Sequence, residues 1–214
     1  MHQAVMPISP PPADDRSHAQ QMAALKQAQD AKVKAASTRR GIVVVHTGNG
    51  KGKSTAAYGM LLRTIGHGKR VGLVQFIKGT WRTGEKQAIA SLPLVDHVVS
   101  GDGFTWDTQD RAQDILSARR GWEAAVDMIE ACRGENPKYH LVILDELNIA
   151  LRYNYIPVQE VVAALQNKPE RLNVVITGRD APAEVIAVAD TVTEMHENKH
   201  AFAAGIKAQI GVDF

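Results

Sequence analysis

Short apolar runs alternate with longer amphipathic segments from residue 41 to the end of the chain. The runs are rich in valine and isoleucine and cover 41–46, 70–76, 94–99, 140–145, 172–177 and 190–195. Helix-like segments separate them at 53–66, 109–132, 157–167 and 181–188. Continuous apolar runs indicate strands that are buried on both faces. The pattern therefore predicts an α/β fold, in which a mostly parallel sheet is flanked by helices on each side.

The first 40 residues lack this pattern. A proline-rich stretch, MHQAVMPISPPPADD, precedes a segment rich in Ala, Gln and Lys that has few branched apolar residues. Such compositions bury too little apolar surface to form a core, so we expect a flexible N-terminal arm over 1–40 with a helix of marginal stability. The arm is either an unstructured leader or a helix that folds over a ligand. A single domain over 41–214 follows it.

The composition excludes several classes of protein. With 214 residues and 44% hydrophobic content, the chain can form one well-packed core. Its single cysteine, Cys132, rules out an intrachain disulfide and zinc sites built from several cysteines. No apolar run reaches the roughly 18 residues of a membrane span, and no secretory signal is present. A net charge of +2 is too small to indicate nucleic-acid binding. We expect a soluble, cytoplasmic protein.

Residues 46–55, HTGNGKGKST, join the first predicted strand to the first predicted helix. The phosphate-binding motif G-x-x-x-x-G-K-[ST] matches at Gly52, Lys53 and Ser54, but its leading glycine, Gly48, comes one residue late. Glycines let the backbone amides converge on an anion, and the helix N-terminus adds partial positive charge. This stretch predicts an ATP site. The predicted ATP-binding residues are Thr47, Gly48, Asn49, Gly50, Lys51, Gly52, Lys53, Ser54, Thr55 and, from another strand end, Arg179.

Two adjacent acids, Asp145 and Glu146, end the predicted strand HLVILDE. Nucleotide-binding proteins of this architecture place a metal-holding carboxylate there, and the Ser54 hydroxyl is predicted to face the same metal. Oxygen ligands beside phosphates predict Mg²⁺, with Mn²⁺ as the alternative. Arg179 follows a different strand in TGR. Ligands of open parallel sheets bind at the carboxyl ends of the strands, so Arg179 is predicted to contact phosphate unless it pairs with Asp180.

The nucleotide-binding parts alone do not decide the reaction. The other predicted strand-end loops contain two of the three tryptophans together with amide and basic side chains, which suits a large, flat second substrate. One of these loops, GDGFTWDTQD over 101–110, places Phe104 and Trp106 two residues apart. A small-molecule kinase whose acceptor binds these aromatics is one interpretation. His46, next to the phosphate loop, is interpreted as structural.

Several stretches resemble the P-loop type of ATP:cob(I)alamin adenosyltransferase, the corrinoid adenosyltransferases. They are TGNGKGKST, QFIKG, GFTW with the following TQ, VILDELN, VVITGR, ADTVTEM and KHAFAAGIKAQIG, and they span about 41–214. The late glycine of the phosphate loop is itself a feature of that family. The resemblance implies a three-layer P-loop fold of the RecA-like type. It also implies a homodimer that receives electrons from a flavoprotein or a reduced flavin.

The resemblance further implies the reaction. The 5′-deoxyadenosyl group of ATP is transferred to the Co(I) of a reduced corrinoid, and triphosphate is released, in cobalamin biosynthesis and corrinoid salvage. The aromatic pair that matches Phe104 and Trp106 displaces the lower axial ligand of cobalt, which makes Co(II) easier to reduce. Lys53 is expected to stabilise charge on the leaving triphosphate. A non-catalytic, ATP-dependent corrinoid carrier is the second alternative.

Overall fold

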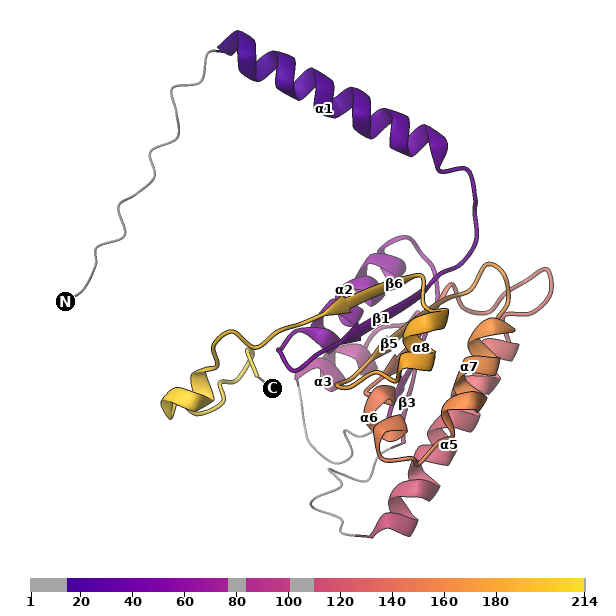
Figure 1. Cartoon of the computed structure of the whole chain (residues 1–214). Coiled ribbons are helices and arrows are strands. Elements are labelled where there is room, and N and C mark those ends of the chain that lie inside the picture. The colour runs from indigo at the N-terminus through magenta and orange to yellow at the C-terminus, as the bar shows by residue number, and fades with distance from the viewer. Residues whose placement is uncertain (1–14, 77–83, 101–109, 214) are drawn as a thin grey trace. The chain divides into compact units, whose positions relative to one another are not determined.

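The computed structural model describes residues 15–76, 84–100 and 110–213 (Figure 1). The chain divides into two compact units, Met1–Arg39 and Arg40–Phe214. In the first unit, the helix α1 (Asp15–Ala35) exposes all of its described side chains. Within the residues that the structure describes, no helix combines the length and the apolar character needed to cross a membrane.

Six parallel strands form the sheet of the second unit. They are β1 (Val43–Thr47), β2 (Val71–Gln75), β3 (Val95–Val99), β4 (Leu141–Asp145), β5 (Asn173–Thr177) and β6 (Thr191–Glu194). Their order across the sheet is β3-β2-β4-β5-β1-β6. Each strand overlaps the apolar run that predicted it, and each pairing is parallel. The predicted α/β fold with a parallel sheet is confirmed.

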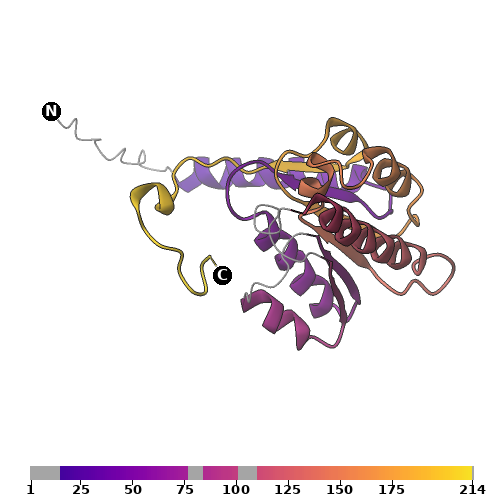
Figure 2. The same ribbon diagram turned by 90° about the horizontal axis from the view of Figure 1, so that it is seen from below.

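Helices cover both faces of this sheet (Figures 1 and 2). Four of them were predicted, namely α2 (Lys53–Gly66), α5 (Arg111–Glu130), α7 (Val158–Gln166) and α8 (Ala183–Val188). The structure contains three further helices that the sequence pattern does not predict, α3 (Gly84–Ala90), α6 (Leu147–Arg152) and the 3₁₀ helix η1 (Ala201–Ala204). These three elements have at most seven residues, which is too few for a helical period to show.

Each face of the sheet packs into its own hydrophobic cluster. Val43 and Val45 of β1 belong to the cluster that includes α5, α6, α7 and α8. Val44, between them, belongs to the cluster that includes α2 and α3. Strand side chains alternate between faces, so burial of every residue in β1, β2 and β4 explains why these strands show no polar alternation. The result is a three-layer arrangement with the carboxyl ends of all strands at one edge.

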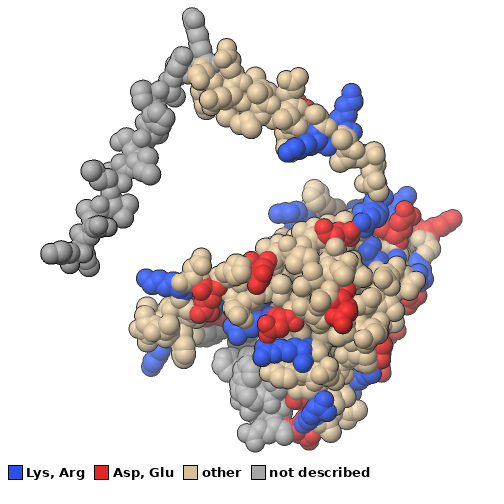
Figure 3. All heavy atoms as spheres, in the orientation of Figure 1, with Lys and Arg blue, Asp and Glu red and all other residues tan. Residues whose placement is uncertain are grey.

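Charged side chains of both signs are interspersed on the surface of the second unit that Figure 3 shows. Several form ion pairs, such as Arg40 with Asp190, and Arg119 with Glu160, whose closest atoms are 2.6 Å apart. Exposed pairs of this kind contribute little to stability, so the clusters on the two faces of the sheet dominate it.

Candidate active site

The loop between β1 and α2 turns at two glycines with left-handed backbone conformations. Gly48 has a φ of 91° and Gly52, the N-cap of α2, has a φ of 110°. Side chains with a Cβ adopt such angles only at an energetic cost, which explains the glycines. The N–H group of Gly50 donates to the carbonyl of Met195 at 2.7 Å. A Cβ on Gly50 would lie 2.6 Å from the carbonyl oxygen of His196, so the loop fits closely against the segment after β6.

Lys53, the first residue of α2, packs against this loop with 7% of its surface exposed. Its Nζ donates to the carbonyl of Gly50 at 2.6 Å. Burial lowers the pKa of Lys53, the nearby Glu146 carboxylate opposes that shift, and the positive charge of Arg179 adds to it. The positive charges of Lys53 and Arg179 repel each other, and an anion bound at the glycine loop would relieve this repulsion. The arrangement suits a polyphosphate.

Arg179 lies at the carboxyl end of β5, in a turn where Gly178 and Asp180 both have positive φ angles. The sequence left open whether Arg179 pairs with Asp180. The Asp180 carboxylate instead accepts a hydrogen bond from Arg152 of α6 at 2.6 Å. This turn is tied to the phosphate loop, because the N–H group of Ala181 donates to Thr47 Oγ1 at 3.1 Å.

A row of polar side chains crosses the carboxyl end of the sheet. The register aligns Gln75 with Asp145, and it aligns His46 with both Thr177 and Thr193. Residues aligned across parallel strands project to the same face. Val44, two residues before His46, packs in the cluster that includes α2, so the row lies on the face that α2 covers.

Asp145 is fully buried in this row, and both of its carboxylate oxygens accept hydrogen bonds. Thr177 Oγ1 donates to Oδ1 at 2.7 Å, and the Tyr58 hydroxyl donates to Oδ2 at 2.6 Å. Gln75 Nε2 lies 3.3 Å from the same Oδ2. Burial raises the pKa of Tyr58, and the adjacent Asp145 carboxylate raises it further, so the hydroxyl keeps its proton. The carboxylate therefore has a fixed orientation.

Glu146 begins the turn from β4 into α6 with a left-handed φ of 62°. Its backbone N–H group donates to Thr177 Oγ1 at 2.9 Å. A non-glycine residue in this conformation is strained, and such strain concentrates at functional sites. Together with Ser54 in the first turn of α2, the two acids offer the hard oxygen donors that Mg²⁺ prefers. By its chemistry, this set of oxygen donors is of the type that fits a magnesium ion.

The predicted corrinoid-binding residues, Phe104 and Trp106, lie outside the described residues. The residues on both sides of 101–109 are described. The N–H group of Ser100 donates to the carbonyl of Gln75 at 2.9 Å, which joins the end of β3 to the end of β2. Asp110 is the N-cap of α5, and its carboxylate accepts a hydrogen bond from the N–H group of Ala112 at 3.0 Å.

Sequence reasoning missed several residues that the structure brings to Asp145. Tyr58 belongs to no motif, and on α2 it resembles an ordinary core aromatic. In the sequence, Gln75 belongs to the stretch QFIKG and Thr177 to TGR, and neither stretch indicates a contact with Asp145. His46 is 5% exposed, and in the described part of the chain neither of its ring nitrogens has a hydrogen-bond partner. Burial lowers the pKa of His46, which favours the neutral imidazole.

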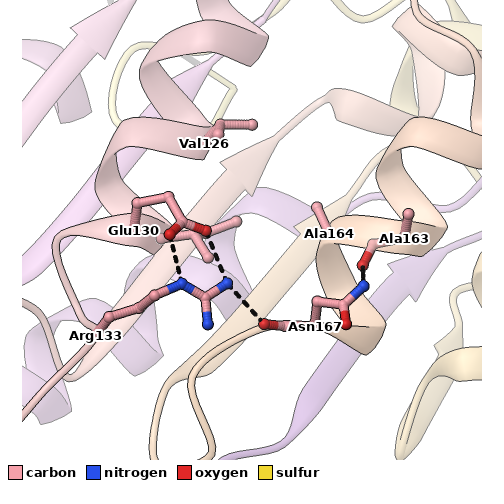
Figure 4. Close-up of a pocket in the computed structure, with 7 residues that line it drawn as sticks. Val126, Glu130, Arg133, Ala163, Ala164 and Asn167 are labelled. Atoms are coloured by element: carbon pink, nitrogen blue, oxygen red, sulfur yellow. Dashed lines mark hydrogen bonds and ion pairs between the residues drawn. The ribbon is translucent and has the colours of Figure 1, made fainter.

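A pocket of about 250 Å³ lies elsewhere, between the ends of α5 and α7 (Figure 4). Arg133 lines it and donates to Glu130 at 2.8 Å and to the carbonyl of Asn167 at 2.9 Å. Lys168, which follows Asn167 in the chain, donates to the carbonyls of Gly41 and Leu172, and these two residues precede β1 and β5. The pocket is therefore at the amino ends of the strands, away from the phosphate loop.

Comparison with known proteins identifies similar sequences along almost the whole chain. Residues 39–214 match the family model described as ATP:corrinoid adenosyltransferase BtuR/CobO/CobP. A corrinoid adenosyltransferase of Pseudomonas aeruginosa is 48% identical over 204 residues, which cover 95% of this chain and 98% of that protein. One from Escherichia coli K12 is 45% identical, over 94% of this chain and 99% of that protein. The corrinoid adenosyltransferase CobA of Salmonella typhimurium is 43% identical with the same coverage.

Proposed function

Because the chain belongs to the ATP:corrinoid adenosyltransferase family BtuR/CobO/CobP, we propose that the loop between β1 and α2 holds the triphosphate of ATP at the carboxyl edge of the sheet. The protein is a corrinoid adenosyltransferase, which adenosylates corrinoids with ATP in cobalamin synthesis. One observation supports the proposed ATP position above all others. Lys53 and Arg179 bring two positive charges to a glycine-rich loop that opens a helix.

The proposed reaction is a nucleophilic displacement at the ribose. Co(I) of the reduced corrinoid attacks C5′ of ATP, a cobalt to carbon bond forms, and the bond between C5′ and oxygen breaks with its electrons passing to triphosphate. The protein supplies no nucleophile. Its contribution is to orient the two substrates and to stabilise the charge that gathers on triphosphate, through the loop amides, Lys53 and Arg179.

Three residues would hold the metal ion in this site. They are Ser54 at the start of α2, and Asp145 and Glu146 at the end of β4. When bound, Mg²⁺ neutralises phosphate charge; Mn²⁺ is the alternative ion. Asp145 reaches the site with both oxygens already hydrogen-bonded to protein, so its orientation does not depend on the ion.

Phe104 and Trp106 are proposed to bind the corrinoid and to displace the lower axial ligand of cobalt. The support is the position of the loop ends, since Ser100 is bonded to the end of β2, beside Asp145 in the next strand. A reduced flavin or flavoprotein as electron donor, a homodimer and a cytoplasmic location are part of the same proposal.

The test combines the protein with ATP, Mg²⁺ and a chemically reduced corrinoid. The expected products are a light-sensitive alkylcobalt species and inorganic triphosphate. Release of ADP would indicate a kinase, and binding without an alkylcobalt product would indicate a carrier. Lys53→Ala should abolish the reaction, whereas Lys69→Ala, an exposed lysine just beyond α2, should leave it unchanged.

A second test addresses the aromatic pair. Phe104→Ala combined with Trp106→Ala should leave ATP binding intact. It should reduce turnover most when Co(II) must be reduced on the protein, because only that step depends on removing the axial ligand. An equal loss with preformed Co(I) would contradict the assigned role.

A further inference from the structure

Gln75, the last residue of β2, uses every polar group of its side chain although it is only 1% exposed. Its Nε2 donates to the Tyr58 hydroxyl at 2.6 Å and lies 3.3 Å from Asp145 Oδ2. Its Oε1 lies 2.8 Å from His97 Nε2. A buried amide is tolerated only when its donors and acceptor are satisfied, and here they are satisfied by side chains from α2, β4 and β3.

The hydrogen bonds define the orientation of the amide. The Tyr58 hydroxyl donates to Asp145, so the hydroxyl oxygen is left as an acceptor for the Gln75 amide nitrogen. The opposite end of the amide, Oε1, then faces His97, whose Nε2 carries the proton for this bond. Rotating the amide by half a turn would set Oε1 against the Tyr58 oxygen and Asp145 Oδ2, which are both acceptors, and would remove the donor from each of them.

We infer that Gln75 is a positioning residue that fixes the Asp145 carboxylate for the metal and triphosphate of bound ATP. The inference rests on the proposed function, which places Asp145 at the metal. The terminal torsion of an aspartate is broad, so a carboxylate does not hold one plane by itself. Thr177 fixes Oδ1, and Gln75 fixes Oδ2 both directly and through Tyr58. Groups behind a metal ligand set its orientation and hence the affinity of the site.

The two donors to Oδ2 are not equivalent. Tyr58→Phe removes one hydroxyl and leaves Gln75 Nε2 at 3.3 Å from Asp145 Oδ2, so Gln75 can still donate to the carboxylate. Gln75→Met removes the direct donor, deprives the Tyr58 oxygen of its donor, and leaves His97 Nε2 without an acceptor. The Gln75 substitution should therefore have the larger effect, although Tyr58 makes the shorter of the two contacts with Oδ2.

The experiment measures ATP binding by calorimetry with Mg²⁺ and with a chelator in its place. The readout is the ratio of the two dissociation constants, that is, the value with chelator divided by the value with Mg²⁺. Gln75→Met should reduce that ratio by roughly tenfold, the effect expected for a partner behind a metal ligand. Tyr58→Phe should reduce it less. In a protein that already carries Asp145→Asn, Gln75→Met should have no further effect on the ratio, because Gln75 acts through Asp145.

Val74→Ala is the matched control. Val74 precedes Gln75 on β2 and is fully buried in the cluster on the other face of the sheet, so the substitution lowers stability without touching the polar row. It should leave the ratio unchanged. If Gln75→Met does not fold, Gln75→Leu removes the same donors and acceptor with a side chain of similar volume.

The outcomes separate this inference from the proposed function. A wild-type ratio in both Gln75 variants, or an undiminished effect of Gln75→Met beside Asp145→Asn, overturns the inference alone. A wild-type protein whose ATP affinity ignores Mg²⁺ overturns the proposed metal site, and the inference with it. If Gln75→Met reduces the ratio in the wild-type background and has no effect on it in the Asp145→Asn background, the result supports both the inference and the proposed metal site.

Discussion

Replacing His46 with phenylalanine should raise the free energy of unfolding by about 1 kcal/mol at neutral pH. The imidazole is 5% exposed, and neither ring nitrogen has a partner in the described part of the chain. A buried polar group without a hydrogen bond costs about 1–3 kcal/mol relative to the same group in water. Phenylalanine removes that cost and keeps an aromatic ring on the side of β1 that faces α2. Part of the gain is lost because the larger ring must fit a close-packed site.

The same substitution should change how stability depends on pH. Burial lowers the pKa of His46 in the folded protein, so the unfolded chain binds a proton first as the pH falls below about 6.5. The wild-type protein therefore loses stability from about pH 7 downward, until the lower folded pKa is reached and the loss stops. His97, whose pKa is also lowered by burial, adds to this loss. The variant keeps only the His97 part, so its advantage should grow on acidification.

Urea unfolding at about pH 8 and about pH 5.5 measures both effects. His67→Phe is the control, because His67 is an exposed residue at the C-terminal end of α2 and should yield no gain. The reasoning fails if His46→Phe is less stable than the wild type at the higher pH. It also fails if the two proteins lose the same free energy between the two conditions.

Three further substitutions test other contacts. Gly50→Ala should weaken ATP binding by more than about tenfold in calorimetry, because the new Cβ would lie 2.6 Å from the carbonyl oxygen of His196 and force the loop to move; unchanged affinity would contradict this. Thr177→Val should cost about 1–3 kcal/mol in urea unfolding, since Asp145 Oδ1 loses its donor. The ion pair with Arg40 lowers the pKa of Asp190 to about 2. The contribution of this pair to stability is therefore complete above about pH 4 and is lost as the pH falls toward 2. Asp190→Asn should lack this acid-dependent loss in an acid titration followed by circular dichroism, and a wild-type profile would refute it.

The strands and the longer helices could be predicted because burial determines where apolar residues stand along the sequence. All five residues of β4 are buried, and the sequence shows them as LVILD, which is most of the predicted run HLVILD. The predicted bounds of α2, 53–66, agree with the structure because a motif marks its start and a glycine lies at its end. The helix α6, with six residues, gave no such signal. Its position depends on the left-handed turn at Glu146, which no periodicity reveals.

The site could be predicted only where its chemistry follows the strand ends. Parallel strands finish at one edge, so the phosphate loop, Asp145 and Arg179 could be assigned to that edge without coordinates. The partners of these residues could not. The partner of Asp180 proved to be Arg152, from a helix that the sequence did not indicate, rather than the adjacent Arg179. Contacts between elements depend on packing, which a single sequence does not encode locally.

The polar row at the carboxyl end of the sheet is costly for a core of this kind. Gln75, Asp145 and Thr177 end three adjacent strands and are at most 1% exposed, where apolar residues of similar volume would pack without any need for hydrogen bonds. One fully buried carboxylate is tolerated because neighbouring strands and α2 supply donors to it. In the described part of the chain, the buried polar residues of the strands thus lie at their carboxyl ends, beside the phosphate loop. Local rules are most often broken at functional sites, so this layer supports the proposed position of the ATP site independently of any motif.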